Sequence, residues 1–192
     1  MIQSRSDMRF YIQEDMKRNN ISRSIIRRFI MGRIINADNY RVARFLYILR
    51  HLEYYKNCKH SLTGKFIYYV LLIIHYRQEA KFNIHLSPNV AGYGLRIMHI
   101  AGGGGCFLSC TKIGNYCGVN SGVLCGKKND LTPTLGNYVT LGPGSKVIGG
   151  VEIGDNSLIA PNAVVLDNVN PNSIMGGIPA KLLKTIENGI YS

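Results

Sequence analysis

The feature that most constrains this chain of 192 residues is an aliphatic side chain that returns at every sixth position. The longest series is Leu135, Leu141, Val147, Ile153, Ile159 and Val165, and the pairs Ile113–Val119 and Ile84–Val90 keep the same spacing. A helix repeats about every 3.6 residues and a half-buried strand about every 2, so neither produces this pattern. A six-residue period is typical of a β-helix in which three hexads make one triangular coil.

Small residues follow several of these aliphatic positions, including Gly136, Gly142, Gly154 and Ala160. In such a coil the aliphatic side chain points inward, and the small residue after it allows the chain to turn a corner. Each coil supplies hydrogen-bond partners for the backbone of the next one. We therefore predict an α+β protein in which residues 81–186 form a left-handed parallel β-helix, followed by a tail at 187–192.

One interruption of the repeat marks a loop. The six-residue spacing runs from Ile113 through Val119 to Cys125 and resumes only at Leu135. Residues 126–133 do not fit the phase, so we expect them to project from the β-helix. Loops held on a rigid scaffold are where binding residues concentrate.

Residues 1–80 show the spacing of helices instead. We expect helical segments at about 7–19, 22–35, 41–55 and 61–76, with Ser22 and Ser61 as N-caps. The third segment carries apolar residues three or four positions apart, which places them on one helical face: Val42, Leu46, Leu49 and Leu52. The last segment is apolar all round, which predicts a helix packed on both sides or lying against a membrane.

The positive charge is concentrated in the helical half. Residues 1–85 contain 16 Lys and Arg against 6 Asp and Glu, whereas residues 86–192 contain 7 against 5. A basic face of this kind suits an anionic membrane surface or an anionic glycan, and it is also common on proteins without such a partner. We expect no nucleic-acid partner, because no platform of aromatic and basic residues is present. The first residues lack the apolar core of a signal peptide, which favours the cytoplasm, with association at the inner membrane face as an option.

The five cysteines are an odd number and contain no C-x-x-C pair. We expect free thiols that pack as small apolar side chains, and no metal site, because the spacings match no set of zinc ligands. The glycine run at 102–105 predicts a corner or loop, and no G-K-[ST] follows it, so it is not a P-loop.

Three segments together resemble the serine acetyltransferase-like branch of the hexapeptide acyltransferases. They are I-H-L-S-P at 84–88, G-L-R-I-M-H at 94–99 and G-G-I-P-A-K at 176–181, with the in-phase hexads between them. The resemblance covers about residues 80–186 and, more loosely, the first helical segment. It implies a homotrimer that binds acetyl-CoA in the groove between neighbouring β-helices.

The resemblance also assigns roles to individual residues. His99 matches the family's catalytic base, which would take the proton of a hydroxyl as it attacks the thioester. The residues that fall where the family lines its CoA groove are Gly142, Pro143, Ala160, Gly177, Lys181 and Lys184. Small residues would admit the pantetheine arm, and the lysines would meet the CoA phosphates. The other histidines, His85 included, are interpreted as structural.

Departures from the family pattern concern the acceptor side. Asn83 and Met98 stand where the serine-specific enzymes of the family carry aspartates, which would leave His99 without its usual orienting carboxylate. In the loop, Asp130 is retained, but Thr132 replaces a second histidine. We therefore take Asn83, Asp130 and Thr132 as acceptor-side candidates and expect an acceptor other than serine.

The hypothesis that follows is an acetyl-CoA-dependent O-acetyltransferase acting on a sugar hydroxyl of a surface polysaccharide or its precursor. Two alternatives stay open: a serine O-acetyltransferase of cysteine biosynthesis, and a non-catalytic trimeric scaffold. The alternatives differ in measurable ways, because the first requires release of CoA with L-serine and the second requires that acetyl-CoA does not bind.

Overall fold

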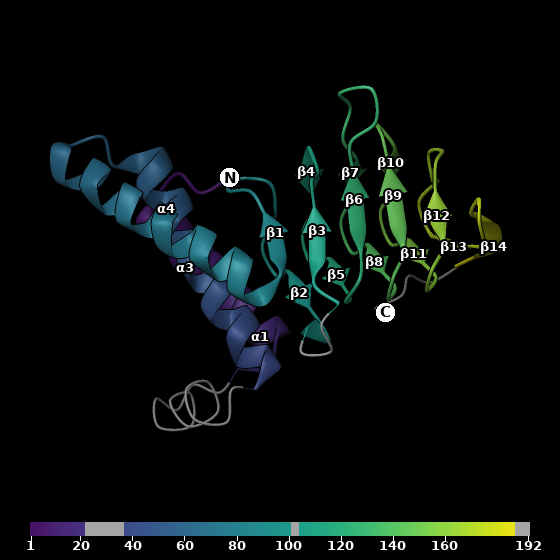
Figure 1. Ribbon diagram of the computed structural model, residues 1–192, viewed down its shortest axis with the longest axis horizontal. Helices are drawn as coiled ribbons and strands as arrows, with labels where there is room; N and C mark the ends of the chain where they lie inside the picture. The colour runs from purple at the N-terminus through teal and green to yellow at the C-terminus, as the bar shows by residue number, and fades with distance from the viewer. Residues whose placement is uncertain (22–36, 101–103, 187–192) are drawn as a thin grey trace.

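The computed structural model describes residues 1–21, 37–100 and 104–186. Three helices, α1 (Arg5–Arg18), α3 (Asp38–Cys58) and α4 (Leu62–Phe82), lie together at one end, and a solenoid of short strands extends away from them (Figure 1). The helix predicted at 22–35 with its Ser22 cap, and the tail at 187–192, lie outside the described residues.

Three parallel sheets form the faces of the solenoid, and the chain passes through them in the order A, B, C. Sheet A contains β1 (Ile84–Leu86), β3 (Cys106–Leu108), β6 (Leu124–Gly126), β9 (Lys146–Ile148) and β12 (Val164–Val165). Sheet B contains β4 (Lys112–Ile113), β7 (Thr134–Leu135) and β10 (Glu152–Ile153). Sheet C contains β2 (Arg96–Ile97), β5 (Gly118–Val119), β8 (Thr140–Leu141), β11 (Leu158–Ile159), β13 (Ser173–Gly176) and β14 (Lys181–Thr185), of which only β14 is antiparallel to its neighbour. The predicted α+β class and parallel β-helix are confirmed.

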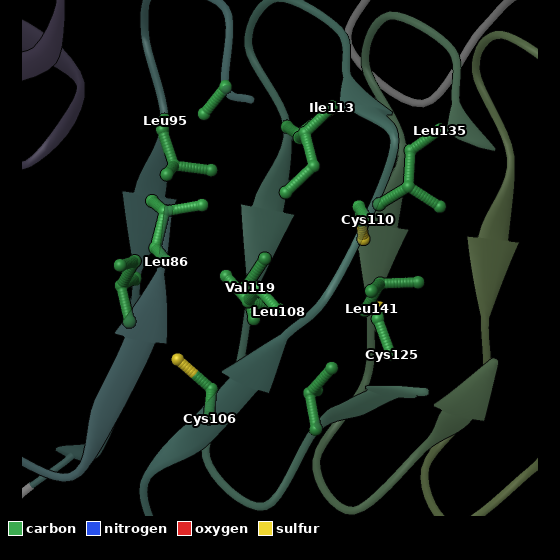
Figure 2. Close-up of a cluster of buried hydrophobic side chains, with 14 of the residues drawn as sticks. Leu86, Leu95, Cys106, Leu108, Cys110, Ile113, Val119, Cys125, Leu135 and Leu141 are labelled. Atoms are coloured by element: carbon green, nitrogen blue, oxygen red, sulfur yellow. The ribbon is translucent and has the colours of Figure 1, made fainter. Parts of the chain in front are cut away.

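The hexad residues fill the interior as predicted. All six members of the long series, Leu135 to Val165, are at most 2% exposed. Figure 2 shows the cysteine side chains lying among the aliphatic ones, with Cys106, Cys110 and Cys125 beside Leu108 and Leu141. All five cysteines are free, and all but Cys58 are buried. The thiols therefore serve as small apolar groups where a larger side chain would overfill a narrow coil.

Two turns of the solenoid are longer than the others. Ile97 pairs with Val119 and Val119 pairs with Leu141, 22 residues apart in each case, whereas Leu141 pairs with Ile159, 18 residues further on. The extra residues of the first long turn lie between strands β2 and β3, and those of the second lie between β6 and β7. The second insertion is the predicted loop, which projects from the solenoid in Figure 1.

The helices confirm most of the sequence expectations. The predicted face of α3 is fully buried, with Val42, Leu46, Leu49 and Leu52 at 0% exposure. The Ser61 side chain caps α4 by accepting a hydrogen bond from the Gly64 N–H at 3.2 Å.

Helix α4 differs from the prediction in two respects. It continues past residue 76 to Phe82, because His75, Gln78 and Phe82 are buried in its last two turns, where it packs against β1. It is also packed on one side only, since Phe66, Tyr69 and Ile73 are more than half exposed. None of the described helices is long and apolar enough to cross a bilayer.

A buried charge network joins the helices to the first turn of the solenoid. Arg50, at 0% exposure, donates from Nε to Asp15 Oδ2 (2.8 Å) and from Nη1 to Glu53 Oε2 (3.0 Å). The same guanidinium donates to the carbonyls of Ala91 (2.9 Å) and Gly92 (2.6 Å). Burial disfavours the charged guanidinium, but the two carboxylates outweigh it and raise the pKa of Arg50 above its ordinary value. Arg50 therefore belongs to the interior and not to the basic surface.

Candidate active site

His99 and the small cofactor candidates lie on one edge of the solenoid, where the chain leaves sheet C and enters sheet A. We call this the C–A edge. The residues that follow successive sheet C strands are His99 after β2, Gly142 and Pro143 after β8, Ala160 after β11 and Gly177 after β13. The sheet C strands are paired in register, Ile97 to Val119, Leu141, Ile159 and then Met175. Neighbouring parallel strands lie about 4.8 Å apart, so these residues form a ladder along the edge.

His99 stands at the start of the insertion of the first turn. Its backbone is left-handed (φ 60°), a conformation that places the side chain at a corner, and the residue is exposed. Among the residues that the structure describes, none forms a hydrogen bond or ion pair with its ring. Gly102 and Gly103 lie outside the described residues.

Each small residue among the cofactor candidates has its own structural reason for being small. A Cβ on Gly142 would lie 2.7 Å from the carbonyl oxygen of Ile159, so the coils can stack only with glycine there. Gly177 has a φ of 93°, which glycine adopts without strain. Pro143 is exposed and Ala160 is half-buried beside it on the edge. Lys181 and Lys184 lie on β14 at the far end of sheet C, and both are exposed.

Asn83 lies at the junction between α4 and sheet A. It ends α4 in a left-handed conformation (φ 54°), and its carbonyl oxygen accepts a hydrogen bond from the Cys106 N–H at 2.9 Å. Asn83 lines a cleft of about 460 Å³ at the beginning of the sheet A strands. The cleft is lined by Glu79, Asn83, Ile84, His85, Gly104, Gly105, Cys106, Phe107, Gly122, Val123 and Leu124. It therefore opens at the end of the same insertion that begins with His99.

Asp130 and Thr132 lie elsewhere, on the loop between sheets A and B. Asp130 Oδ1 pairs with Lys127 Nζ at 2.6 Å, and the Thr132 hydroxyl lies 2.7 Å from the Thr111 hydroxyl. The loop contains one antiparallel bridge, Lys128 to Leu131. Within one chain, the structure does not bring these two acceptor-side candidates together with His99.

The cleft contains a carboxylate–imidazole cluster that the sequence analysis did not identify. Glu79 Oε1 lies 3.4 Å from His85 Nδ1 and 3.5 Å from His75 Nε2, and it accepts a hydrogen bond from the Leu86 N–H at 2.8 Å. The sequence predicts a helix at about 61–76, which does not include Glu79. The available signal was the spacing of His75 and Glu79, since residues four apart on a helix are neighbours.

The titration of these groups follows from their surroundings. Burial alone would raise the pKa of Glu79, but the His75 and Leu86 N–H contacts outweigh it and lower that pKa. Burial raises the pKa of Cys106 to about 12, and that of Cys117 to about 12, so these thiols stay protonated at neutral pH and are not nucleophiles. The described residues contain no group of three or more side chains that could hold a metal ion.

Known proteins share the hexapeptide repeat and, in some cases, most of this chain. Residues 132–167 match the family model described as bacterial transferase hexapeptide (six repeats). A serine acetyltransferase of Helicobacter pylori (strain J99) is 34% identical over 131 residues, which cover 65% of this chain and 74% of that protein. This chain belongs to the serine acetyltransferase branch of the hexapeptide-repeat acyltransferases. The resemblance inferred from the three motifs is thereby confirmed.

Other members of the branch match over different lengths. A serine acetyltransferase of Mycobacterium tuberculosis is 40% identical over 63 residues, and this chain spans only 26% of its length. A solved structure of a serine acetyltransferase in complex with CoA has a TM-score of 0.66 at 19% identity, covering 94% of this chain and 72% of that one. At this identity the structural likeness shows the shared fold, from the helices to the end of the solenoid.

Proposed function

We propose that this acyltransferase is an acetyl-CoA-dependent O-acetyltransferase with His99 as its general base. The observation that carries the proposal is the C–A edge, where the exposed imidazole of His99 lies at one end of a row of small residues. The solved relative bound to CoA supports acetyl-CoA as the co-substrate. A thin pantetheine arm can lie along Pro143, Ala160 and Gly177, with Lys181 and Lys184 near its phosphates as point charges.

The proposed reaction is a direct transfer. His99 removes the proton from a hydroxyl whose oxygen attacks the thioester carbonyl of acetyl-CoA. The carbon–sulfur bond then breaks, and the departing CoA thiolate takes the proton from the imidazolium. The products are the O-acetyl ester and CoA, and the imidazole is restored.

L-serine is the first candidate acceptor, because relatives that this chain matches over most of its length are serine acetyltransferases. This reverses the order of acceptors expected from Asn83, Met98 and Thr132. A sugar hydroxyl is the second candidate, favoured by one observation. The loop hydroxyl of Thr132 is paired with Thr111 and is not an imidazole, so the loop lacks the group that the resemblance assigns to serine binding.

A homotrimer is the assembly that best explains why the candidate site residues lie on two different edges of one chain. His99 lies on the C–A edge, whereas Asp130 and Thr132 lie on the edge between sheets A and B. In a three-fold ring, different edges of neighbouring prisms can face one another. The C–A edge of one chain would then meet the loop of the next, with acetyl-CoA between them.

Contact between α4 and an anionic membrane surface is proposed for the helical region. The exposed residues Leu62, Phe66, Tyr69, Ile73 and Tyr76 form one stripe along α4. Lys65, Arg77 and Lys81 lie exposed on the same helix, which suits an anionic lipid surface. Sedimentation with phosphatidylglycerol vesicles, and with phosphatidylcholine vesicles as the control, tests this contact; equal sedimentation of Phe66→Ser and the wild type would exclude it.

The experiment for the enzymatic proposal follows release of CoA from acetyl-CoA, first with L-serine and then with N-acetylglucosamine. We expect acceptor-dependent release that falls by about 10²- to 10⁴-fold in His99→Ala. His51→Ala, at a partly exposed imidazole on α3, is the matched control and should keep full activity. Absence of acetyl-CoA binding by calorimetry would favour the non-catalytic scaffold, and full activity of His99→Ala would remove His99 as the base.

A further inference from the structure

The cleft at the start of sheet A contains a second accessible imidazole, His85, which contacts both an aromatic ring and a carboxylate. His85 lies on β1, and its ring stacks on Phe107 of β3 with the centroids 4.5 Å apart and 13° between the planes. Both rings line the cleft. The stacking fixes the plane of the His85 ring. The polar neighbours of the ring then determine which nitrogen carries the proton and where each nitrogen points.

Glu79 supplies that direction. Its Oε1 lies 3.4 Å from His85 Nδ1, an ion-pair distance, and the carboxylate is itself held by the Leu86 N–H at 2.8 Å. On the other side lies His75, whose Nε2 is 3.1 Å from the Leu86 carbonyl oxygen. Glu79 cannot swing away without losing these contacts, so it acts as a fixed acceptor facing Nδ1. A carboxylate that faces Nδ1 at this distance favours the neutral tautomer with its proton on Nδ1, in which Nε2 is a hydrogen-bond acceptor.

Nothing else in the described part of the chain uses Nε2. The His85 side chain is 41% exposed, whereas the Glu79 side chain behind it is only 12% exposed. The remaining polar lining comes from Asn83 and from the backbone at Gly104 and Gly105, while Phe107, Val123 and Leu124 supply apolar surface. This combination fits a small polar molecule with an apolar face.

We propose that this cleft is the acceptor subsite and that His85 Nε2 accepts a hydrogen bond from the acceptor's own O–H or N–H donors. Glu79 is the positioning residue, because it acts on the acceptor only through His85. The inference rests on the proposed function for its acceptor chemistry, but it concerns binding and leaves the proton transfer to His99. The donor is an ammonium or hydroxyl group in L-serine, or a ring hydroxyl in a sugar.

The binding experiment reads the ring protons of His85 by NMR, with the resonances assigned from their loss in His85→Phe. L-serine and N-acetylglucosamine are titrated separately into the full chain. We expect one of the two molecules to shift the His85 resonances. The molecule that does so identifies whether the hydrogen-bond donor belongs to an amino acid or to a sugar. If neither molecule shifts them, the inference is overturned, whether or not the protein turns over acetyl-CoA.

The kinetic experiment separates a binding role from a structural one. His85→Phe keeps the stacked ring but removes both nitrogens, so we expect a KM for the acceptor raised about tenfold, the effect of one lost hydrogen bond. The KM for acetyl-CoA should not change. His85→Gln restores an acceptor near the position of Nε2 and should recover part of the loss, and Glu79→Gln should give an intermediate KM.

The outcomes keep this inference distinct from the proposed function. A shift at His85 without any release of CoA would refute the acetyl transfer and retain the subsite. Release of CoA that disappears in His99→Ala but is identical in His85→Phe and the wild type would retain the enzyme and overturn the subsite. Equal melting temperatures of His85→Phe and the wild type confirm that the kinetic comparison concerns folded protein.

Discussion

The helical region and the solenoid share one apolar core, but only their junction also contains a buried charge network. The solenoid interior is almost entirely apolar, with one aliphatic or thiol side chain per hexad stacked on its counterpart in the next turn. The helices contribute to the same apolar core through Val42, Phe45, Leu46, Leu49 and Phe82. They also meet the first turn of the solenoid through a buried arginine, two buried carboxylates and two backbone carbonyls. A repeated apolar contact tolerates local change because each turn depends only on its neighbours. A buried charge network depends on every member at once.

The largest expected effect comes from breaking the network. Arg50→Met leaves Asp15 and Glu53 buried without their cation, so we expect the free energy of unfolding to fall by about 3–5 kcal/mol. Urea denaturation followed by circular dichroism measures it. Arg44→Met, an exposed arginine on the same helix, is the control and should change stability by less than about 0.5 kcal/mol. A similarly small loss in Arg50→Met would show that the shared apolar core alone holds the helices on the solenoid.

The corresponding change in the solenoid removes volume and no charge. Leu141, at 0% exposure, lies in β8 in the middle of sheet C. Leu141→Ala should cost about 2–5 kcal/mol, from lost burial and the cavity that remains. Leu166→Ala, at a leucine that is 46% exposed, is the matched control. A loss below about 1 kcal/mol for Leu141→Ala would indicate that the coils close around the cavity.

A smaller effect is expected at the start of α4. Ser61→Ala removes the side-chain oxygen that accepts from the Gly64 N–H, and such caps contribute about 1 kcal/mol. Thermal unfolding should show the loss, and hydrogen exchange should show it first in residues 62–66. Ser87→Ala, an exposed serine outside any helix, should leave both measurements unchanged.

The smallest effect at neutral pH, and the most specific, concerns the contact of α4 with β1. The pKa of Glu79 is lowered in the folded protein from an unfolded value near 4.5, so the folded state favours the ionised carboxylate. Its contribution to stability is present above about pH 4.5 and is lost as the pH falls through the lowered folded value. Glu79→Gln should therefore be slightly less stable than the wild type at pH 7, and this difference should shrink as the pH falls below 4.5. Parallel acid curves for the two proteins would contradict this assignment.

Much of the fold was predictable because its determinants are local. The six-residue spacing identifies the buried residues of each hexad, and the jump from Cys125 to Leu135 identifies the loop. The helical face of α3 and the Ser61 cap follow from spacing and residue type. The end of α4 was predicted six residues too early, because its last turns are held by the first coil and not by their own sequence.

The candidate site was predictable only in part. Matching motifs placed His99 and the cofactor residues, but counting hexads does not align them, because the turns between sheet C strands differ by four residues. Their common edge appears only when the strands are paired. Glu79 and His85 were missed as a pair because they meet across the boundary between a helix and a strand.

The sequence alone therefore determined which side chains face inward, since alternation along a hexad depends only on neighbouring residues. It also determined the family, through motifs that keep their spacing. The tertiary structure decided which corners share an edge, since that depends on the length of every turn. It also decided which buried charges join the helices to the solenoid and which imidazole lies beside a carboxylate. Polar partners that are distant in sequence are brought together by the fold, so no repeated spacing in the sequence reveals them.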